Sequence, residues 1–212
     1  MKIDDMSNKV DITLLLIRHG KTVFNIERRY MGQTDLELTD EGREEIKQIF
    51  EDKTQGPGAV LASFFEEGMP LFSSPMKRCL GTAQTILPGR TFKAIADLKE
   101  MDFGDFEGKT WAELEKQDDY RAFIESSGRI APPNGEARED FIRRVWGGVI
   151  SCCDEIRERG FNKGILVIHG GTIMALMSYL DKGSYYDYLP SNGHGYLIRL
   201  DKDRGLVSYE RV

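Results

Sequence analysis

The stretch Ile12-Thr13-Leu14-Leu15-Leu16-Ile17-Arg18-His19-Gly20 is an apolar run that ends in histidine and glycine. The same ending recurs in Ile165-Leu166-Val167-Ile168-His169-Gly170-Gly171, so two of the three histidines in the chain occupy equivalent places. A short apolar run bounded by glycine is typical of a buried strand in a parallel sheet. Such sheets bind ligands beyond the carboxyl ends of their strands. The two endings therefore predict an enzyme site built around a pair of histidines.

The bulk composition narrows the class of protein. The chain has 212 residues, of which 40% are hydrophobic and 30% charged, as in a soluble globular protein. We expect one domain over residues 1–212, with a flexible lead at residues 1–10. The net charge of −6 disfavours nucleic acid or an anionic membrane as a partner. Residues 1–10 lack the apolar segment of a signal peptide, and no apolar run approaches the ~18 residues of a membrane span. A cytoplasmic location is expected.

Apolar periodicity divides the rest of the chain into strands and helices. Further strands are predicted at 71–72, 165–168, 196–200 and 206–209, and helices at 39–50, 74–87, 110–125, 141–156 and 172–180. Thr39 and Ser74 are the expected N-caps, while segment 59–67 fits either a helix or a strand. Trp111 and Trp146 stand at helical spacing and are expected in the core. The alternation predicts an α/β fold, with a mostly parallel central sheet, helices on both faces and a C-terminal antiparallel hairpin.

The residues beside the two histidines favour phosphate chemistry. A neutral imidazole is a nucleophile near neutral pH, and phosphoryl groups are among its natural electrophiles. Transfer of such a group requires cations, and the forked arginine side chain matches phosphate oxygens. Arg18 adjoins His19, and Arg78 is expected in the first turn of a helix, where backbone N–H groups also favour an anion. Gly20 and Gly170 leave room for a ligand to approach the main chain.

An acid must also protonate the leaving alkoxide. The segment 99–108 offers several carboxylates, and composition alone does not choose among them. They are Glu100, Asp102, Asp105 and Glu107.

The segment Leu16-Ile17-Arg18-His19-Gly20-Lys21-Thr22, followed by Asn25, resembles the signature of the histidine phosphatase superfamily, also called the phosphoglycerate-mutase-like family. Further segments are similar to this family in the expected order. They are residues 32–39, Ser73-Ser74-Pro75-Met76-Lys77-Arg78, Leu98-Lys99-Glu100-Met101-Asp102-Phe103-Gly104 and Val167-Ile168-His169-Gly170-Gly171. The resemblance extends from Leu14 to about residue 200.

This resemblance implies a role for each matching residue. His19 would be the phosphorylated nucleophile, and Glu100 would be the general acid and later the base that activates water. The phosphoryl group would be held by Arg18, Asn25, Arg78 and His169, with help from the Gly170 amide. No metal or other cofactor is implied, and the partner would be a small phosphorylated metabolite.

The superfamily includes phosphatases and mutases, and the compact segment 111–133 resembles the phosphatase branch. Its arginines, Arg121 and Arg129, are isolated, whereas glycolytic mutases carry an arginine pair in an insertion there. The greatest similarity is to alpha-ribazole phosphatases and broad-specificity phosphomonoesterases. The alternatives are a cofactor-dependent phosphoglycerate mutase and, in another class, a non-catalytic module that binds phosphorylated ligands.

Three residues depart from the family pattern and are expected to border the leaving-group pocket. They are Met31, Ala137 and Met174. Glu136 is expected near the mouth of the same pocket, as in relatives that carry a Gly-Glu pair. Met31 and Met174 indicate a more apolar side for the substrate.

Overall fold

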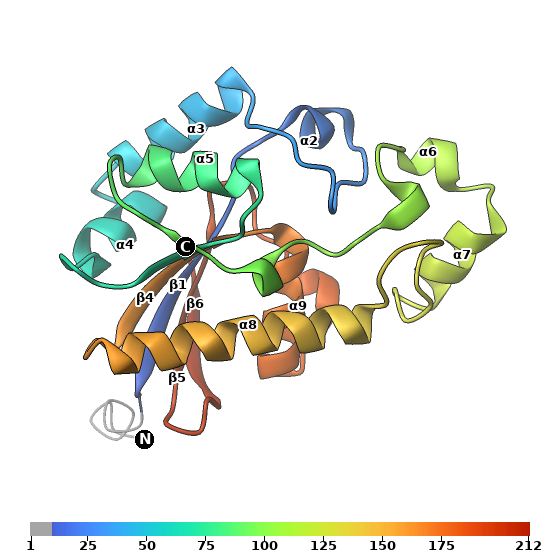
Figure 1. The fold of residues 1–212 in the computed structure, drawn as a ribbon. Helices are drawn as coiled ribbons and strands as arrows, with labels where there is room; N and C mark the ends of the chain where they lie inside the picture. Colours follow the sequence, from blue (N-terminus) through green and yellow to red (C-terminus); the bar gives the residue numbers. More distant parts are fainter. Residues whose placement is uncertain (1–9) are drawn as a thin grey trace.

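Six strands form one sheet in the order β3-β2-β4-β1-β5-β6 (Figure 1). The strands are β1 (Ile12–Arg18), β2 (Leu71–Ser73), β3 (Lys93–Ala94), β4 (Lys163–Ile168), β5 (Gly195–Leu200) and β6 (Leu206–Arg211). The first four are mutually parallel, and β5 and β6 form the antiparallel hairpin. This computed structural model describes residues 10–212, so the expected flexible lead, apart from Val10, lies outside the described residues. The α/β prediction is confirmed.

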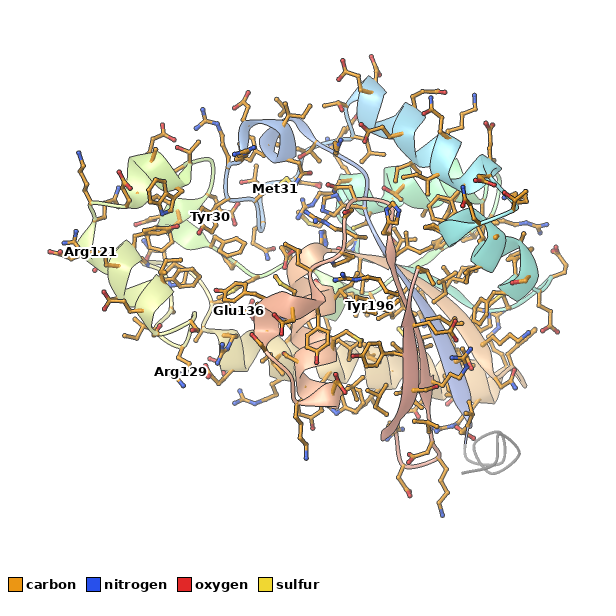
Figure 2. All side chains as sticks on the ribbon, turned by 180° about the vertical axis from the view of Figure 1, so that it is seen from behind. Tyr30, Met31, Arg121, Arg129, Glu136 and Tyr196 are labelled. Carbon is orange, nitrogen blue, oxygen red and sulfur yellow. The ribbon has the colours of Figure 1, made fainter. Side chains whose placement is uncertain are left out.

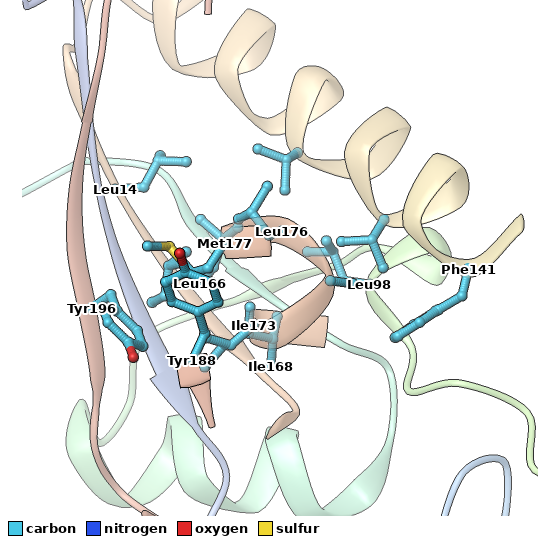
Figure 3. Close-up of a cluster of buried hydrophobic side chains, with 14 of the residues drawn as sticks. Leu14, Leu98, Phe141, Leu166, Ile168, Ile173, Leu176, Met177, Tyr188 and Tyr196 are labelled. Carbon is cyan, nitrogen blue, oxygen red and sulfur yellow. The ribbon is translucent and has the colours of Figure 1, made fainter. Parts of the chain in front are cut away.

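Alternate residues of the central strands point to opposite faces of the sheet and build two cores. Leu14 and Leu16 of β1 belong to one core, whereas Leu15 and Ile17 belong to the other. The first core packs under α8 (Arg138–Glu158) and α9 (Gly170–Asp181), as Figure 3 shows for Leu14, Phe141 and Leu176. The second core packs under α3 (Asp40–Glu51), α4 (Gly56–Phe64) and α5 (Lys77–Ile86). Helices therefore cover both faces.

Two predicted helix starts have different outcomes. Thr39 caps α3, with its side chain accepting a hydrogen bond from the Gly42 N–H, so that prediction is confirmed. Ser74 is not the N-cap of α5; the helix begins two residues beyond Pro75, with Met76 as its N-cap. The Ser74 hydroxyl instead contacts His169. The undecided segment 59–67 contributes most of its residues to α4.

The predicted helix at 110–125 is two short helices, α6 (Trp111–Leu114) and α7 (Asp118–Glu125). Thr110 caps α6 in a capping box with Glu113, and the chain leaves helical geometry before α7 starts. Trp111 is 62% exposed, so its expected place in the core is wrong, whereas Leu114 and Phe123 are buried as expected. Figure 1 shows α6 and α7 beyond the first turns of α8, away from the sheet. Apolar spacing did not reveal this break.

The register of the sheet brings the two His-Gly endings together. β1 and β4 are parallel neighbours, with Arg18 opposite Ile168. The His19 N–H donates to the Ile168 carbonyl at 3.0 Å. Because the strands end at the same level, His19 and His169 leave the sheet at the same edge. A short helix, α2 (Val23–Glu27), follows β1, and the 3-10 turn η3 (Tyr185–Tyr188) follows α9.

Candidate active site

His19 is held as one tautomer at the end of β1. Its Nδ1 lies 2.7 Å from the Gly20 carbonyl oxygen, which can only accept, so Nδ1 carries the proton. The unprotonated nitrogen is therefore Nε2. Burial lowers the pKa of His19 well below 6.5, and the positive charges of Arg78 and Arg18 lower it further. His19 is thus a neutral imidazole whose Nε2 lone pair is free to attack.

His169 is held as the opposite tautomer. The Arg78 Nε–H donates to His169 Nδ1 at 3.2 Å, so the ring proton is on Nε2. That Nε2 lies 2.7 Å from the Ser74 hydroxyl oxygen. Burial also lowers the pKa of His169 well below 6.5, with Arg78 as the next cause. The rings of His169 and His19 meet edge to face, 5.2 Å between centroids.

Arg78 is fully buried beneath this pair, and its side chain is fixed from three directions. Besides His169, its guanidinium donates to the carbonyl oxygens of Thr34 at 2.9 Å and Gly32 at 2.8 Å. A guanidinium has five N–H donors, so this network leaves donors over for an anion. The segment 32–34 is held by Glu107, whose carboxylate accepts from Gln33 N–H at 2.6 Å and Thr34 N–H at 2.7 Å. Glu107 is therefore a structural acid.

Arg18 brings a second guanidinium to the same place. Its Nη1 donates to the Pro190 carbonyl at 2.7 Å, while its buried Nε has no partner among the described residues. A Cβ added to Gly170 would lie 3.1 Å from this Nε, so the glycine lets the main chain of α9 approach the arginine. An unpartnered buried donor is costly unless a ligand satisfies it. Arg18 and the first amides of α9 thus suit a phosphoryl oxygen.

Glu100 lines the same cavity as Arg18 and His19. Each of its oxygens accepts one backbone N–H, from Met101 at 2.9 Å and from Gly171 at 2.8 Å. Burial raises the pKa of this carboxyl above 4.5, against the lowering effect of those two hydrogen bonds. A carboxyl with a raised pKa is suited to donate a proton near neutral pH.

The loop that carries Glu100 is clamped by an arginine from the second turn of α8. Arg144 donates to the carbonyl oxygens of Asp97 at 3.0 Å and Lys99 at 3.2 Å. The same guanidinium forms a two-pronged ion pair with Glu136, at 3.0 and 2.7 Å. Gln33 holds the Glu100 carbonyl from the other side at 2.9 Å. Glu136 is therefore a partner of the clamp, and its expected position at the pocket mouth is wrong.

A cavity of about 670 Å³ opens over these groups. Of the predicted site residues, Arg18, His19, Asn25, Glu100 and Gly170 line it. Arg78 and His169 lie beneath it, both fully buried. Asn25 is fixed by its Oδ1, which accepts from the Thr22 N–H at 3.0 Å.

The departures from the family pattern divide into two groups. Met31 and Met174 line the cavity, as expected, whereas Ala137 and Glu136 border a different hollow beside Arg144. Figure 2 shows Tyr30 and Met31 further inside the molecule, with Arg121 of α7 and Arg129 at its edge.

The model of the histidine phosphatase superfamily (branch 1) matches residues 14–207. The chain belongs to the histidine phosphatase superfamily. Its relatives in this superfamily have several activities. A 2,3-bisphosphoglycerate-dependent phosphoglycerate mutase of Methylocella silvestris is 31% identical over 82% of this chain and 83% of its own length. Phosphoserine phosphatase 1 of Hydrogenobacter thermophilus is 23% identical over 92% of this chain and 90% of its own.

Some relatives are longer than this chain. The similar solved structures cover nearly all of it. A bifunctional protein of Mycobacterium tuberculosis is 28% identical over 92% of this chain, which spans only 49% of that relative. A putative alpha-ribazole-5'-P phosphatase of Escherichia coli superposes with a TM-score of 0.77 at 24% identity, covering 95% of this chain and 94% of that one. Bacillus stearothermophilus YhfR gives 0.73 at 28% identity, covering 92% and 94%.

Sequence reasoning missed the residues that orient this histidine phosphatase site. The sequence pattern places Ser74 at a helix cap, and no pattern marks Arg144. Both act through long-range contacts, since Ser74 lies 95 positions from His169 and Arg144 lies 45 from Lys99. Ser74 stands inside a matched segment, which was the available signal; Arg144 had none.

Across residues 10–212, every helix falls short of the length and apolar character that crossing a bilayer requires. Within the same range, no three His, Cys, Asp or Glu side chains gather closely enough to hold a metal ion.

Proposed function

We propose that this protein is a phosphomonoesterase that hydrolyses a small phosphorylated metabolite through a phosphohistidine at His19. The observation that carries the proposal is the bond between His19 Nδ1 and the Gly20 carbonyl, which leaves Nε2 unprotonated. Arg18 beside it presents a buried N–H without a partner among the described residues, and Glu100 carries a carboxyl of raised pKa. Nucleophile, anion site and acid meet at one cavity.

In the first half of the reaction, His19 Nε2 attacks phosphorus and the bond from phosphorus to the ester oxygen breaks. The leaving oxygen takes the proton of Glu100, and the alcohol departs. Arg18 and Arg78 balance the charge on the phosphoryl oxygens, and Asn25 and the Gly170 amide donate to them. The Nε2–H of His169 is the remaining donor. It donates to the phosphoryl group once its hydrogen bond to the Ser74 hydroxyl has broken.

In the second half, water replaces the alcohol. Glu100, now ionised, takes a proton from water as the water oxygen attacks phosphorus. The bond from phosphorus to Nε2 breaks, and inorganic phosphate leaves. The lone pair returns to Nε2, and Glu100 is again protonated, so the enzyme is regenerated.

The segment 111–133 supports water rather than a sugar acid as the acceptor. Its two arginines, Arg121 and Arg129, stand where glycolytic mutases carry their arginine pair, and neither lines the cavity. Arg121 is ion-paired with Asp118 on the surface. Names of similar proteins include phosphatases for phosphoserine and, at the level of fold, alpha-ribazole phosphate. These two esters are the natural substrates to test first.

Hydrolysis of p-nitrophenyl phosphate with EDTA present tests the proposal. We expect turnover that persists in EDTA and is lost in His19→Ala. No turnover between acidic and neutral pH would overturn the enzyme assignment in favour of a binding module. Conversion of 3-phosphoglycerate to its 2-isomer faster than phosphate release would instead establish a mutase.

A further inference from the structure

Besides the groups around His19, two groups of aromatic side chains form parts of the cavity wall. One wall contains Tyr30 and Phe103, whose rings pack edge to face at 5.0 Å, and reaches Phe123 of α7. The other wall contains Tyr185 and Tyr186 of η3, with ring centroids 5.3 Å apart. At the phosphate end the cavity also contacts Met31 and Met174. A slot between aromatic rings suits a flat apolar group.

Several apolar side chains of these walls are open to solvent. Ile124 is 43% exposed and Tyr186 is 56% exposed, although both line a concave site. Apolar surface gathered in a concave place beside charged groups marks a ligand site. These aromatic residues line the same cavity as His19. We therefore expect the leaving group of the substrate to bind between them.

Arg138, the first residue of α8, also lines this cavity. Its backbone N–H donates to the Gly128 carbonyl at 2.9 Å, which fixes the arginine beside the turn that ends α7. Its guanidinium carbon lies 5.6 Å from the centroid of the Tyr185 ring. The nearest carboxylate, Glu139, is 3.7 Å from Nη2, and the buried Nε has no partner among the described residues.

Arg29 also lines the cavity, and its guanidinium forms ion pairs and hydrogen bonds with other residues of the protein. It pairs with Glu27, and it donates to Glu113 at 3.0 Å and to the Gly108 carbonyl at 2.7 Å. Among the described residues, two carboxylates balance the charge of Arg29, whereas Arg138 has a single carboxylate partner at 3.7 Å. The Arg138 guanidinium donates no hydrogen bond among the described residues and is 20% exposed, so its donors are available to an acceptor on a ligand.

One tyrosine side chain spans the gap between Arg138 and the reacting groups. The Tyr185 ring lies under the guanidinium of Arg138, and its hydroxyl donates to the Gly171 carbonyl at 3.4 Å. The N–H of that same Gly171 donates to Glu100 at 2.8 Å. A substrate lying along Tyr185 would thus place its phosphate at His19 and a group about one aromatic ring away at Arg138.

We propose that Arg138 determines substrate specificity by binding a carboxylate or similar acceptor at the far end of a flat, ring-containing leaving group. This inference rests on the proposed phosphomonoesterase function and names the class of ester that it favours. The preferred substrate carries phosphate at one end of a planar body and an anionic acceptor at the other.

The test compares phenyl phosphate with 4-carboxyphenyl phosphate in the wild type, in Arg138→Met and in Arg143→Met. Methionine keeps the length and apolar stem of arginine but removes the donor. Arg143 lies on the same helix, is exposed and does not line the cavity, so it is the matched control. Each variant is characterised by its ratio of kcat/KM for the carboxylated ester to kcat/KM for the plain ester. Comparing these ratios between variants cancels the different reactivities of the two phenols.

We expect Arg138→Met to lower this ratio about tenfold, the loss of one charged hydrogen bond, while Arg143→Met leaves it unchanged. Equal losses on both esters, or no change, would overturn the specificity role while leaving the phosphatase intact. If neither ester is hydrolysed, the proposed function fails, and calorimetric binding of 4-carboxyphenyl phosphate decides the inference. Tighter binding to the wild type than to Arg138→Met supports it, and equal binding overturns it.

Discussion

The rings of His19 and His169 lie edge to face at 5.2 Å, yet their hydrogen bonds hold them as opposite tautomers. The Nδ1–H of His19 donates a hydrogen bond to a backbone carbonyl, whereas Nδ1 of His169 accepts one from Arg78. Two similar strand endings thus leave opposite ring nitrogens unprotonated, because their neighbours differ.

Nitrogen-15 NMR of labelled protein at neutral pH tests this asymmetry. We expect His19 to be protonated at Nδ1 and His169 at Nε2, with neither ring doubly protonated, because burial and nearby arginines lower both pKa values. A proton on His19 Nε2 would contradict the assignment of this ring as the nucleophile.

The pH dependence of kcat/KM reports His19 and Glu100 in the free enzyme. His19 must be neutral to attack, and its lowered pKa places the acidic limb of the profile below pH 6.5. Glu100 must be protonated to act as the acid, and its raised pKa places the alkaline limb above pH 4.5. Activity should therefore decline toward alkaline pH.

The Glu100→Gln variant isolates the alkaline limb, because titration of the substrate is common to both enzymes. We expect a loss of about a hundredfold or more in kcat/KM at the optimum, together with disappearance of that limb. An unchanged alkaline limb in Glu100→Gln would show that another group is the acid.

Arg144 is expected to act on the reaction by positioning Glu100. Replacing Arg144 by Lys removes its fork to Glu136 and its contacts with the 97–100 backbone. We expect kcat to fall about tenfold or more, with little change in KM and a displaced alkaline limb. Glu136→Gln should shift kcat in the same direction, and Arg143→Lys is the control. A loss of thermal stability with an unchanged pH profile would indicate a merely structural role.

Gly171 leaves the space that Glu100 occupies. A Cβ at this position would lie 2.2 Å from Glu100 Oε1. The carboxylate is the end of a flexible side chain, so we expect Gly171→Ala to displace it while the fold survives. Activity should fall about a hundredfold, as for a displacement of about 1 Å in a catalytic group.

Gly147 in α8 is the matched control, since nothing lies within 4 Å of a Cβ added there. Gly147→Ala should keep full activity and raise the unfolding free energy by about 0.5–1 kcal/mol, because alanine favours a helix interior. Equal activity in the two alanine variants would show that the position of Glu100 does not limit the reaction.

Local patterns in the sequence predicted the elements that place the site. The apolar runs before His19 and His169 form neighbouring parallel strands, and the alternation of Leu14, Leu15 and Leu16 serves both cores. Residues whose role depends on distant partners were not predictable in this way. Trp111 fits the apolar spacing of a helix, but its side chain is exposed to solvent. The role proposed for Arg138 depends on its contact with the Tyr185 ring, which the sequence does not show.

The measurement that tests the central claim most directly is rapid quenching of the enzyme during turnover, followed by mass spectrometry of its peptides. We expect an acid-labile phosphate on the peptide that contains His19, absent in His19→Ala and longer-lived in Glu100→Gln, in which the base that activates water is missing. Phosphate on the peptide of His169, or turnover without any bound phosphate in either the wild type or Glu100→Gln, would contradict the assignment of His19 as the nucleophile.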